Sequence, residues 1–417
     1  MTQLFSKKAL HVALSLAVAA GVSFSANAEK MTLKQAAKSD MVSKSLETSF
    51  NGVALPTIGT ARERVTFTQV LAGSESIQAN VGQTFTSESR NFKMLATGEE
   101  LSKGINLPIS SPSALVRVIP MSGSTAIDEK MLQVNANGQW LSSDEAFAKT
   151  FDANELTAAG LESPKGSFAM KMKAEPGKNG MLMRSEQSLA AADRFNVLVF
   201  EPKSNEVLKT TLDKTRVVQG ENILVNAAMT KDGSAMALSS VEAFVMAPGS
   251  TEPQAVQVRQ RRGSAVAVID TANMLASAPG LFEVHLVTAS NEGGVKSLRT
   301  DKVAFAVAPK TARLTGDVEV EHSAAAMTMS FAVESVLPGR YEVSAVVYGT
   351  DARGRMVPGV LTATAQWLDA NGTITLEVPE VELSATGLVA PFEVKSLKLK
   401  DQTRLSELWS QESALEM

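Results

Sequence analysis

Alternation of apolar and polar residues governs the chain from about Val207 onward and predicts a succession of β-strands. In one run every second residue is apolar, namely Ile223, Val225, Ala227 and Met229. Similar runs occupy residues 241–246, 265–269, 281–289 and 303–307. Turn-forming stretches such as Lys231-Asp232-Gly233 separate the runs. Short strands at this spacing predict an immunoglobulin-like β-sandwich over residues 205–310.

The same pattern restarts after Thr311. Four apolar residues fall on one strand face, namely Met327, Met329, Phe331 and Val333. Further strands are predicted at residues 339–348, 361–368 and 373–378, and Asp369-Ala370-Asn371-Gly372 is a strong turn signal between the last two. We therefore expect a second immunoglobulin-like sandwich over residues 311–400. A short tail, residues 401–417, would follow, and a helix is one interpretation of it.

The first half differs in kind, and residues 29–204 are interpreted as a mixed, mostly β domain. Residues 29–48 read as a loosely held arm or a helix, and strand-like runs lie at 64–71, 114–119 and 168–173. Two short helices are predicted where a capping residue precedes a glutamate by three positions, at Ser142–Glu145 and Asp152–Glu155. The predicted fold class is therefore mainly β, with this domain followed by the two sandwiches.

Residues 1–28 carry the features of a secretory signal peptide. Lys7 and Lys8 precede an apolar run from Ala9 to Val22, and the small-residue triplet Ala26-Asn27-Ala28 follows. We expect cleavage between Ala28 and Glu29. The run is short for a membrane span, so no integral membrane segment is expected after cleavage. The predicted location is the periplasm or the exterior of the cell.

The amino-acid composition excludes several kinds of catalytic and metal-binding site. The 417 residues include no cysteine and only three histidines, so a zinc–thiolate site, a cysteine nucleophile and a multi-histidine metal site are excluded. The formal net charge of −4 is a mild acidic excess and does not suggest nucleic acid as a partner. No phosphate loop, dinucleotide fingerprint or nucleophile elbow is present, and no cofactor is expected.

A methionine-rich constellation is the one motif with a testable geometry. Met170 and Met172 alternate with other residues, the stretch Glu175–Gly180 forms a turn, and Met181 and Met183 follow. A hairpin symmetric about that turn would place Met172 opposite Met183 and gather all four thioethers on one face. Such a face suits copper(I) or an apolar ligand. The favoured alternative is a core face, because alternating apolar residues most often mean burial.

Three other clusters are assigned structural roles. His285 lies in an expected strand without a serine or cysteine motif, which favours a packed or hydrogen-bonded histidine. In Glu319-Val320-Glu321-His322 a strand would point the glutamates and the histidine to opposite faces, which argues against a metal site. The basic run Arg259–Gly263 is interpreted as the solvent-exposed side of a hairpin.

Three stretches together resemble a known family. They are Gly98–Pro120, Thr211–Met229 and Leu383–Leu405. The arrangement resembles the exported proteobacterial family catalogued as domain of unknown function 4785. That resemblance implies an N-terminal domain followed by two immunoglobulin-like domains, and it implies no catalytic residue.

The function expected from these observations is non-enzymatic. The protein would be a binding module for a protein, a peptide or a component of the cell envelope. One alternative is a soft-metal or apolar-ligand binder that uses Met170, Met172, Met181 and Met183. A second alternative is a hydrolase with an unrecognised carboxylate site in the N-terminal domain.

Overall fold

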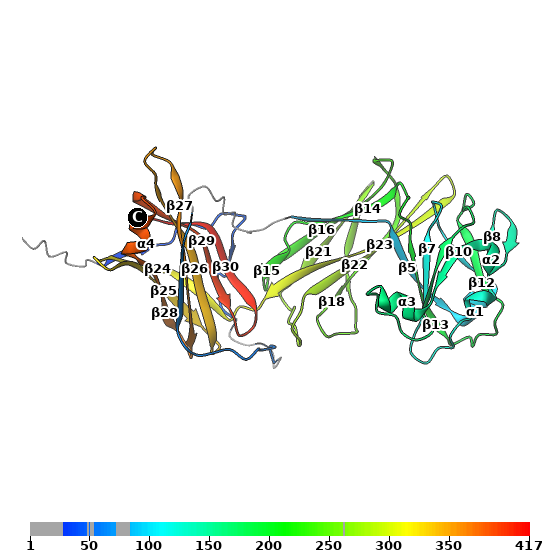
Figure 1. Cartoon of the computed structure of the whole chain (residues 1–417), viewed down its shortest axis with the longest axis horizontal. Coiled ribbons are helices and arrows are strands. Elements are labelled where there is room, and N and C mark those ends of the chain that lie inside the picture. The colour runs from blue at the N-terminus through cyan, green and yellow to red at the C-terminus, as the bar shows by residue number, and fades with distance from the viewer. Residues whose placement is uncertain (1–27, 48–49, 51–53, 72–83, 262) are drawn as a thin grey trace, which may run out of the picture.

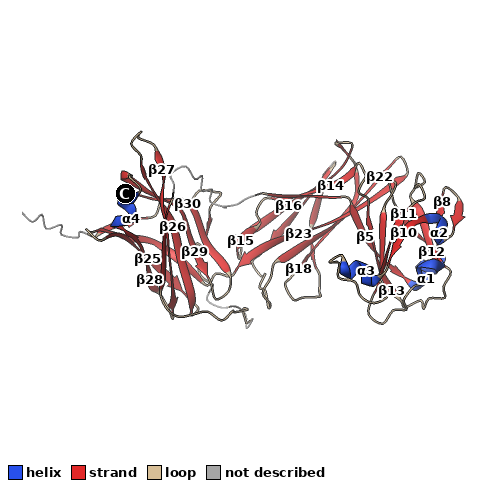
Figure 2. Ribbon diagram, in the orientation of Figure 1, coloured by secondary structure: helices blue, strands red, loops and turns tan. Residues whose placement is uncertain are grey.

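The structure is a computed structural model, and it describes residues 28–47, 50, 54–71, 84–261 and 263–417. The chain forms three strand-rich domains in a row (Figure 1). Strands dominate all three domains, and the few helices are short (Figure 2). The prediction of a mainly β, multidomain protein is confirmed.

The first domain packs two antiparallel sheets around one core. The larger sheet has the order β10 (Phe147–Phe151), β11 (Phe168–Met172), β7 (Leu115–Pro120), β13 (Arg194–Phe200) and β5 (Asn91–Thr97). The smaller sheet has the order β6 (Ile105–Leu107), β12 (Met181–Ser185), β8 (Leu132–Ala136) and β9 (Gln139–Leu141). The space between the sheets is filled by apolar residues from alternate positions of the strands, among them Phe92, Val116 and Val197.

The first domain also contains short helices: α1 (Gly98–Lys103), the 3₁₀ turn η1 (Glu129–Met131), α2 (Ser143–Ala146) and α3 (Ala153–Ala158). The two capping boxes found in the sequence are present, because Ser142 and Asp152 are the N-caps of α2 and α3. A third capping box, at Thr97 and Glu100, begins α1. Each box satisfies backbone N–H groups that have no partner within the helix.

The second domain is also a sandwich of two sheets. One sheet has the order β20 (Val258–Arg261), β21 (Ser264–Asp270), β16 (Asn222–Lys231), β14 (Glu206–Leu212) and β4 (Phe85–Ser89), with β17 (Ser234–Ala235) paired to β16. The other has the order β15 (Arg216–Val218), β23 (Val295–Ala308), β22 (Phe282–Glu292), β18 (Leu238–Met246) and β19 (Gln254–Val256). Ile223, Val225, Ala227 and Met229 point into the core, as their alternation predicted.

The third domain contains the longest strands. Its smaller sheet has the order β1 (Glu29–Thr32), β24 (Ala312–His322), β25 (Ala326–Ser335) and β28 (Gly372–Pro379). The larger sheet has the order β2 (Met41–Val42), β30 (Ser406–Glu416), β29 (Val389–Asp401), β26 (Gly339–Thr350), β27 (Met356–Leu368) and β3 (Val65–Val70). The helix α4 (Glu380–Ala385) follows β28. Met327, Met329, Phe331 and Val333 share the core, as predicted.

The N-terminal segment does not belong to the first domain, in contrast to the predicted unit of residues 29–204. The strands β1, β2 and β3 pair with β24, β30 and β27 of the third domain, and β4 pairs with β14 of the second. Within the segment interpreted as an arm or a helix, residues 29–48, the strands β1 and β2 correct that prediction. Sequence periodicity identifies a strand but not its partner, and these partners lie hundreds of residues away.

The tail of residues 401–417 also differs from its prediction. Residues Ser406–Glu416 form β30, which pairs with β29 and with β2. Leu408, Ala414 and Leu415 are buried in the third core. The helical interpretation of this tail is wrong, because the segment is a strand that pairs with β29 over most of its length.

Candidate functional site

The four methionines do not form the predicted hairpin. The strand β11 pairs with β7 and β10, whereas β12 pairs with β6 and β8 of the opposite sheet. Met172 thus lies opposite Phe147, and Met183 lies opposite Val134. All four side chains belong to the first core and are at most 3% exposed: Met170, Met172, Met181 and Met183. Their burial agrees with the core alternative, and copper(I) binding by them stays a prediction.

The remaining sequence candidates lie apart from one another. Val320 is buried while Glu319 and His322 are exposed, and Glu319 lies 3.8 Å from Lys30 in an ion pair. Arg259 and Arg261 are exposed on the short strand β20, and Arg262 lies outside the described residues. None of these residues lines the larger grooves of the molecule.

A groove of about 1320 Å³ separates the first domain from the second. Its first wall is the outer face of the β5–β13–β7 sheet together with α3. Its second wall comes from β18, β22 and β23, and of these β23 contacts β5. Strand alternation builds the first wall, because residues between the core positions of β5 and β13 point outward into the groove.

Large apolar side chains stand exposed in this groove. Four of them line it, namely Leu95, Met121, Leu161 and Phe200, with exposed fractions from 42% to 55%. They come from two strands and two loops of the first domain. A concentration of exposed apolar side chains in a concave surface is typical of a binding site, whereas scattered single ones need no explanation.

His285 is part of the second wall. Its ring stacks on Phe244 at 5.0 Å between centroids, and its Nε2 donates a hydrogen bond to Glu283 Oε2 at 3.1 Å. Burial lowers the pKa of His285, and the nearby carboxylate only partly opposes that shift. The hydrogen bond from Lys302 lowers the pKa of Glu283, so Glu283 is the acceptor. The neutral histidine is therefore held in a fixed orientation, as the structural interpretation of His285 anticipated.

Polar groups border the apolar surface. Arg117 donates to Ser163 Oγ at 2.9 Å, and burial lowers the pKa of its guanidinium. Lys93 points outward from β5 and makes no ion pair within the described part of the chain. The side-chain amides of Asn91 and Asn196 likewise make no intramolecular hydrogen bond among the described residues. These groups can therefore hydrogen-bond to a ligand.

A buried ionic cluster fixes the two walls of the groove relative to each other. Arg299 of β23 is fully buried, and its Nη2 lies 2.8 Å from Oε2 of the equally buried Glu201, which follows β13. The contact is an ion pair rather than an aligned hydrogen bond. Glu206 of β14 completes the cluster, and its carboxylate accepts from Ser297 Oγ at 2.7 Å and from Lys231 Nζ at 3.0 Å.

Hydroxyl and backbone groups complete the shell of Arg299. Its Nη2 donates to Ser204 Oγ at 2.8 Å and to Ser110 Oγ at 3.1 Å, and its Nε donates to the Glu206 carbonyl at 3.1 Å. The backbone N–H of Ser111 donates to Glu201 at 2.9 Å. Removing Arg299 would leave the carboxylate of Glu201 buried without an opposite charge, whereas Glu206 would keep its ion pair with Lys231. We call Glu201, Glu206 and Arg299 the junction cluster, and it makes the groove a preformed feature.

The sequence indicated a structural role for His285 but did not indicate the groove that His285 lines. The exposed apolar residues come from separate segments, so no local motif announces them. One signal in the sequence was a strand with apolar residues on both faces. In β13 the inward residues are Phe195, Val197 and Val199, and the outward residues include Leu198 and Phe200. Such a strand is apolar on two faces, which indicates a second buried or binding surface.

The described residues hold no group of three or more histidine, aspartate or glutamate side chains placed to bind a metal ion. In the same part of the chain no helix is both long and apolar enough to cross a membrane. Glu201 is the fully buried carboxylate next to the first domain, and its bonds to Arg299 and Ser111 account for its position.

Family models match both ends of the molecule. The model described as the N-terminal domain of a domain of unknown function, DUF4785, matches residues 56–201. The model of the DUF4785 C-terminal domain matches residues 311–417. The chain belongs to the DUF4785 family. The resemblance seen in the sequence is therefore confirmed, and no functionally curated protein matches this DUF4785 chain significantly.

A solved structure supports the fold of this DUF4785 protein. The crystal structure of a DUF4785 family protein from Legionella pneumophila subsp. pneumophila str. Philadelphia 1 superposes with a TM-score of 0.72 at 15% identity. The match covers 90% of this chain and 99% of that chain, and at such identity it shows the fold alone. Trypsin-activated alpha-2-macroglobulin from Escherichia coli is matched at a TM-score of 0.22 and 10% identity, over 86% of this chain and 24% of that one.

Proposed function

We propose that this protein is a non-enzymatic binding module of the cell envelope. Its ligand is an extended peptide segment of a partner protein, bound in the groove between the first and second domains. The observation that carries the proposal is the gathering of Leu95, Met121, Leu161 and Phe200 in one concave surface. We further propose that cleavage after Ala28 releases the chain into the periplasm or the exterior, as its leader predicts.

The polar lining favours a peptide over a purely apolar ligand. Peptides present amide groups at regular intervals, and Asn91 and Asn196 offer both donors and acceptors to such groups. Lys93 and Arg117 line the groove without an ion pair among the described residues, whereas Lys302 is paired with Glu283. We therefore expect peptides with apolar side chains and at least one carboxylate.

The junction cluster supports the proposal energetically. A groove between two domains that move independently would have to be ordered when the ligand binds, and that ordering would reduce the affinity. The buried contacts of Arg299 hold the two walls before any ligand arrives.

Selection of ligands from a random peptide library on the mature chain tests this proposal. The affinities of the enriched peptides are then measured by fluorescence anisotropy for the wild type and for the double variant L95E/F200E. We expect at least a tenfold loss of affinity, because the variant places two carboxylates within the apolar surface. The matched control is L182E/V268E, since both of its positions are 40% exposed and lie on strands away from the groove.

The control variant is expected to bind within about twofold of the wild type. The absence of any enriched peptide, or equal affinity of the wild type and L95E/F200E, would show that the groove is not a peptide site. Peptides that bind L182E/V268E as weakly as L95E/F200E would also contradict the proposal, because the effect would then come from charge alone.

A further inference from the structure

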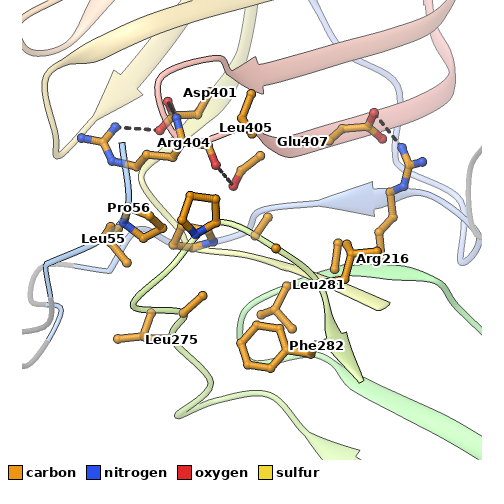
Figure 3. Close-up of a pocket in the computed structure, with 18 of the residues that line it drawn as sticks. Leu55, Pro56, Arg216, Leu275, Leu281, Phe282, Asp401, Arg404, Leu405 and Glu407 are labelled. Atoms are coloured by element: carbon orange, nitrogen blue, oxygen red, sulfur yellow. Dashed lines mark hydrogen bonds and ion pairs between the residues drawn. The ribbon is translucent and has the colours of Figure 1, made fainter. Parts of the chain in front are cut away.

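A second, smaller cavity lies at the junction between the second and third domains. It has a volume of about 470 Å³, which falls within the range of small-molecule sites. Five segments line it: residues 55–58 of the N-terminal segment, Arg216 and Val217 of β15, the loop 274–282 before and into β22, the end of β23, and the turn between β29 and β30 (Figure 3). Residues far apart in the sequence thus build one enclosure.

The cavity surface is apolar at its opening. Ile58, Leu281 and Leu405 line it and are 40%, 54% and 68% exposed. Pro56, Leu275 and Phe282 extend this apolar lining, as Figure 3 shows. Exposed apolar side chains on three separate segments are costly in water, and a ligand that covers them would recover part of that free energy.

The charged groups of the lining are already neutralised. Arg216 Nη1 lies 3.0 Å from Glu407 Oε2, and Arg404 Nη1 lies 2.8 Å from Asp401 Oδ2 (Figure 3). Lys400 Nζ lies 2.9 Å from Glu342 Oε1. Every charged lining residue therefore has an opposite charge within the protein, so a ligand charge would find no free counter-charge. This complementarity favours an uncharged ligand.

Leu405 occupies a position that disfavours its side chain. Its φ of 52° lies in the left-handed region, where glycine or asparagine is usual, although nothing in the turn requires a large apolar group. The same residue is the most exposed of the apolar residues that line the cavity. Strain of this kind often accompanies a functional position.

We propose that this cavity, which we call the junction pocket, is a binding site for an uncharged, apolar small molecule. Leu405 and Leu281 cover opposite sides of the ligand, and the N-terminal segment around Pro56 forms a further wall. The site is independent of the peptide groove, with which it shares no lining residue.

The test uses N-phenyl-1-naphthylamine, an uncharged apolar probe whose fluorescence rises on transfer from water. Titrations are made on the L95E/F200E background, so that binding in the peptide groove does not contribute. The decisive variant is Leu405→Gly, because glycine removes the side chain and accepts a positive φ without strain. We expect saturable binding of one probe per chain, weakened at least fivefold by Leu405→Gly, with a melting temperature that does not fall.

A second variant, Leu281→Ser, is expected to weaken binding by a similar factor. The control Leu224→Ser changes a 40% exposed leucine outside both cavities and should leave the affinity unchanged. Absence of saturable binding, or equal probe affinity with and without the Leu405 side chain, would overturn the proposal. Because Leu405, Leu281 and Leu224 lie outside the peptide groove, a change of affinity between these variants is independent of whether the peptide proposal holds.

Discussion

Arg299 illustrates why a single residue can govern a multidomain protein. It is one of the largest fully buried side chains in the described structure, and it connects the linker after β13 with β14 and β23. A buried guanidinium is tolerated only when its donors are matched by acceptors, and here two carboxylates, two hydroxyl groups and two backbone carbonyls supply them.

The substitution Arg299→Met tests this role. It leaves Glu201 and Glu206 buried beside an apolar side chain, so we expect a loss of about 3–5 kcal/mol in the free energy of unfolding of the affected domains. Denaturant unfolding followed by circular dichroism gives the measurement. The matched control is Arg313→Met, which breaks a partly exposed pair with Glu334 and should cost about 1 kcal/mol or less. Equal losses in the two variants would contradict a special role for the junction cluster.

His285 carries a pH dependence. Burial lowers its folded-state pKa below the usual 6.5, so as the pH falls below that value the unfolded chain takes up a proton that the folded protein resists. Stability should therefore decrease from pH 7 towards pH 5 and be restored on return to neutral pH. Melting temperatures of the wild type and His285→Gln across this range provide the test. If the melting temperature fell by the same amount in both proteins, His285 would not be the cause of the pH dependence.

Individual residues were predictable from the sequence to differing extents. The structural role of His285 followed from its place in an expected strand without a serine or cysteine motif nearby, and the core positions of β16 and β25 followed from alternation. The ion pairs of Arg299 did not follow, because Ser110, Glu201 and Arg299 are brought together only by tertiary structure. The same reason explains why Leu95 was not recognised as a binding-site residue.

At the level of elements, the N-terminal strands are the main departure from the sequence-based prediction. The strand β1 begins at Glu29, the first residue after the predicted cleavage site, and pairs with β24 at the edge of the third domain. Leu33 continues this contact by donating its N–H to the Gly316 carbonyl at 2.8 Å. The third domain therefore needs both ends of the chain, which raises the sequence separation of its contacts.

Removal of residues 29–33 from the mature chain tests the role of β1. The truncation exposes the edge of β24 and withdraws Met31 and Leu33 from the third core. We expect amide hydrogens of β24 to exchange at least tenfold faster, while those of β7 in the first domain keep their rate. The measurement is hydrogen exchange with mass spectrometry.

The milder variant Met31→Asp keeps the backbone of β1 and should give an intermediate effect. Unchanged exchange in β24 after truncation would mean that β1 contributes nothing to the third domain.

Element type was more predictable than element partnership. The helices α2 and α3 followed from their capping boxes, and most strands of the second and third domains followed from period-two alternation. The methionine hairpin failed because β11 and β12 join two facing sheets rather than one. The chain between them, residues 173–180, therefore passes at the surface from one sheet to the facing sheet instead of returning along the same sheet.

At the scale of the whole molecule, three domains in a row leave two junctions, and each junction has a cavity. The first junction is fixed by the junction cluster and borders the large peptide groove. At the second junction the ion pair between Arg216 and Glu407 joins the two domains, and the N-terminal segment lines the junction pocket. An elongated arrangement of domains exposes more surface for binding than one globular core of equal length.

The most direct test of the account is site-specific photocrosslinking in cells that export the full chain. A benzoylphenylalanine replaces Leu95 in the groove or Leu182 on the opposite sheet of the first domain. We predict that the probe at position 95 joins the chain to one reproducible envelope protein through an extended segment, and that the probe at position 182 gives no such product. No adduct at position 95, or the same adduct at both positions, would contradict a peptide-binding groove.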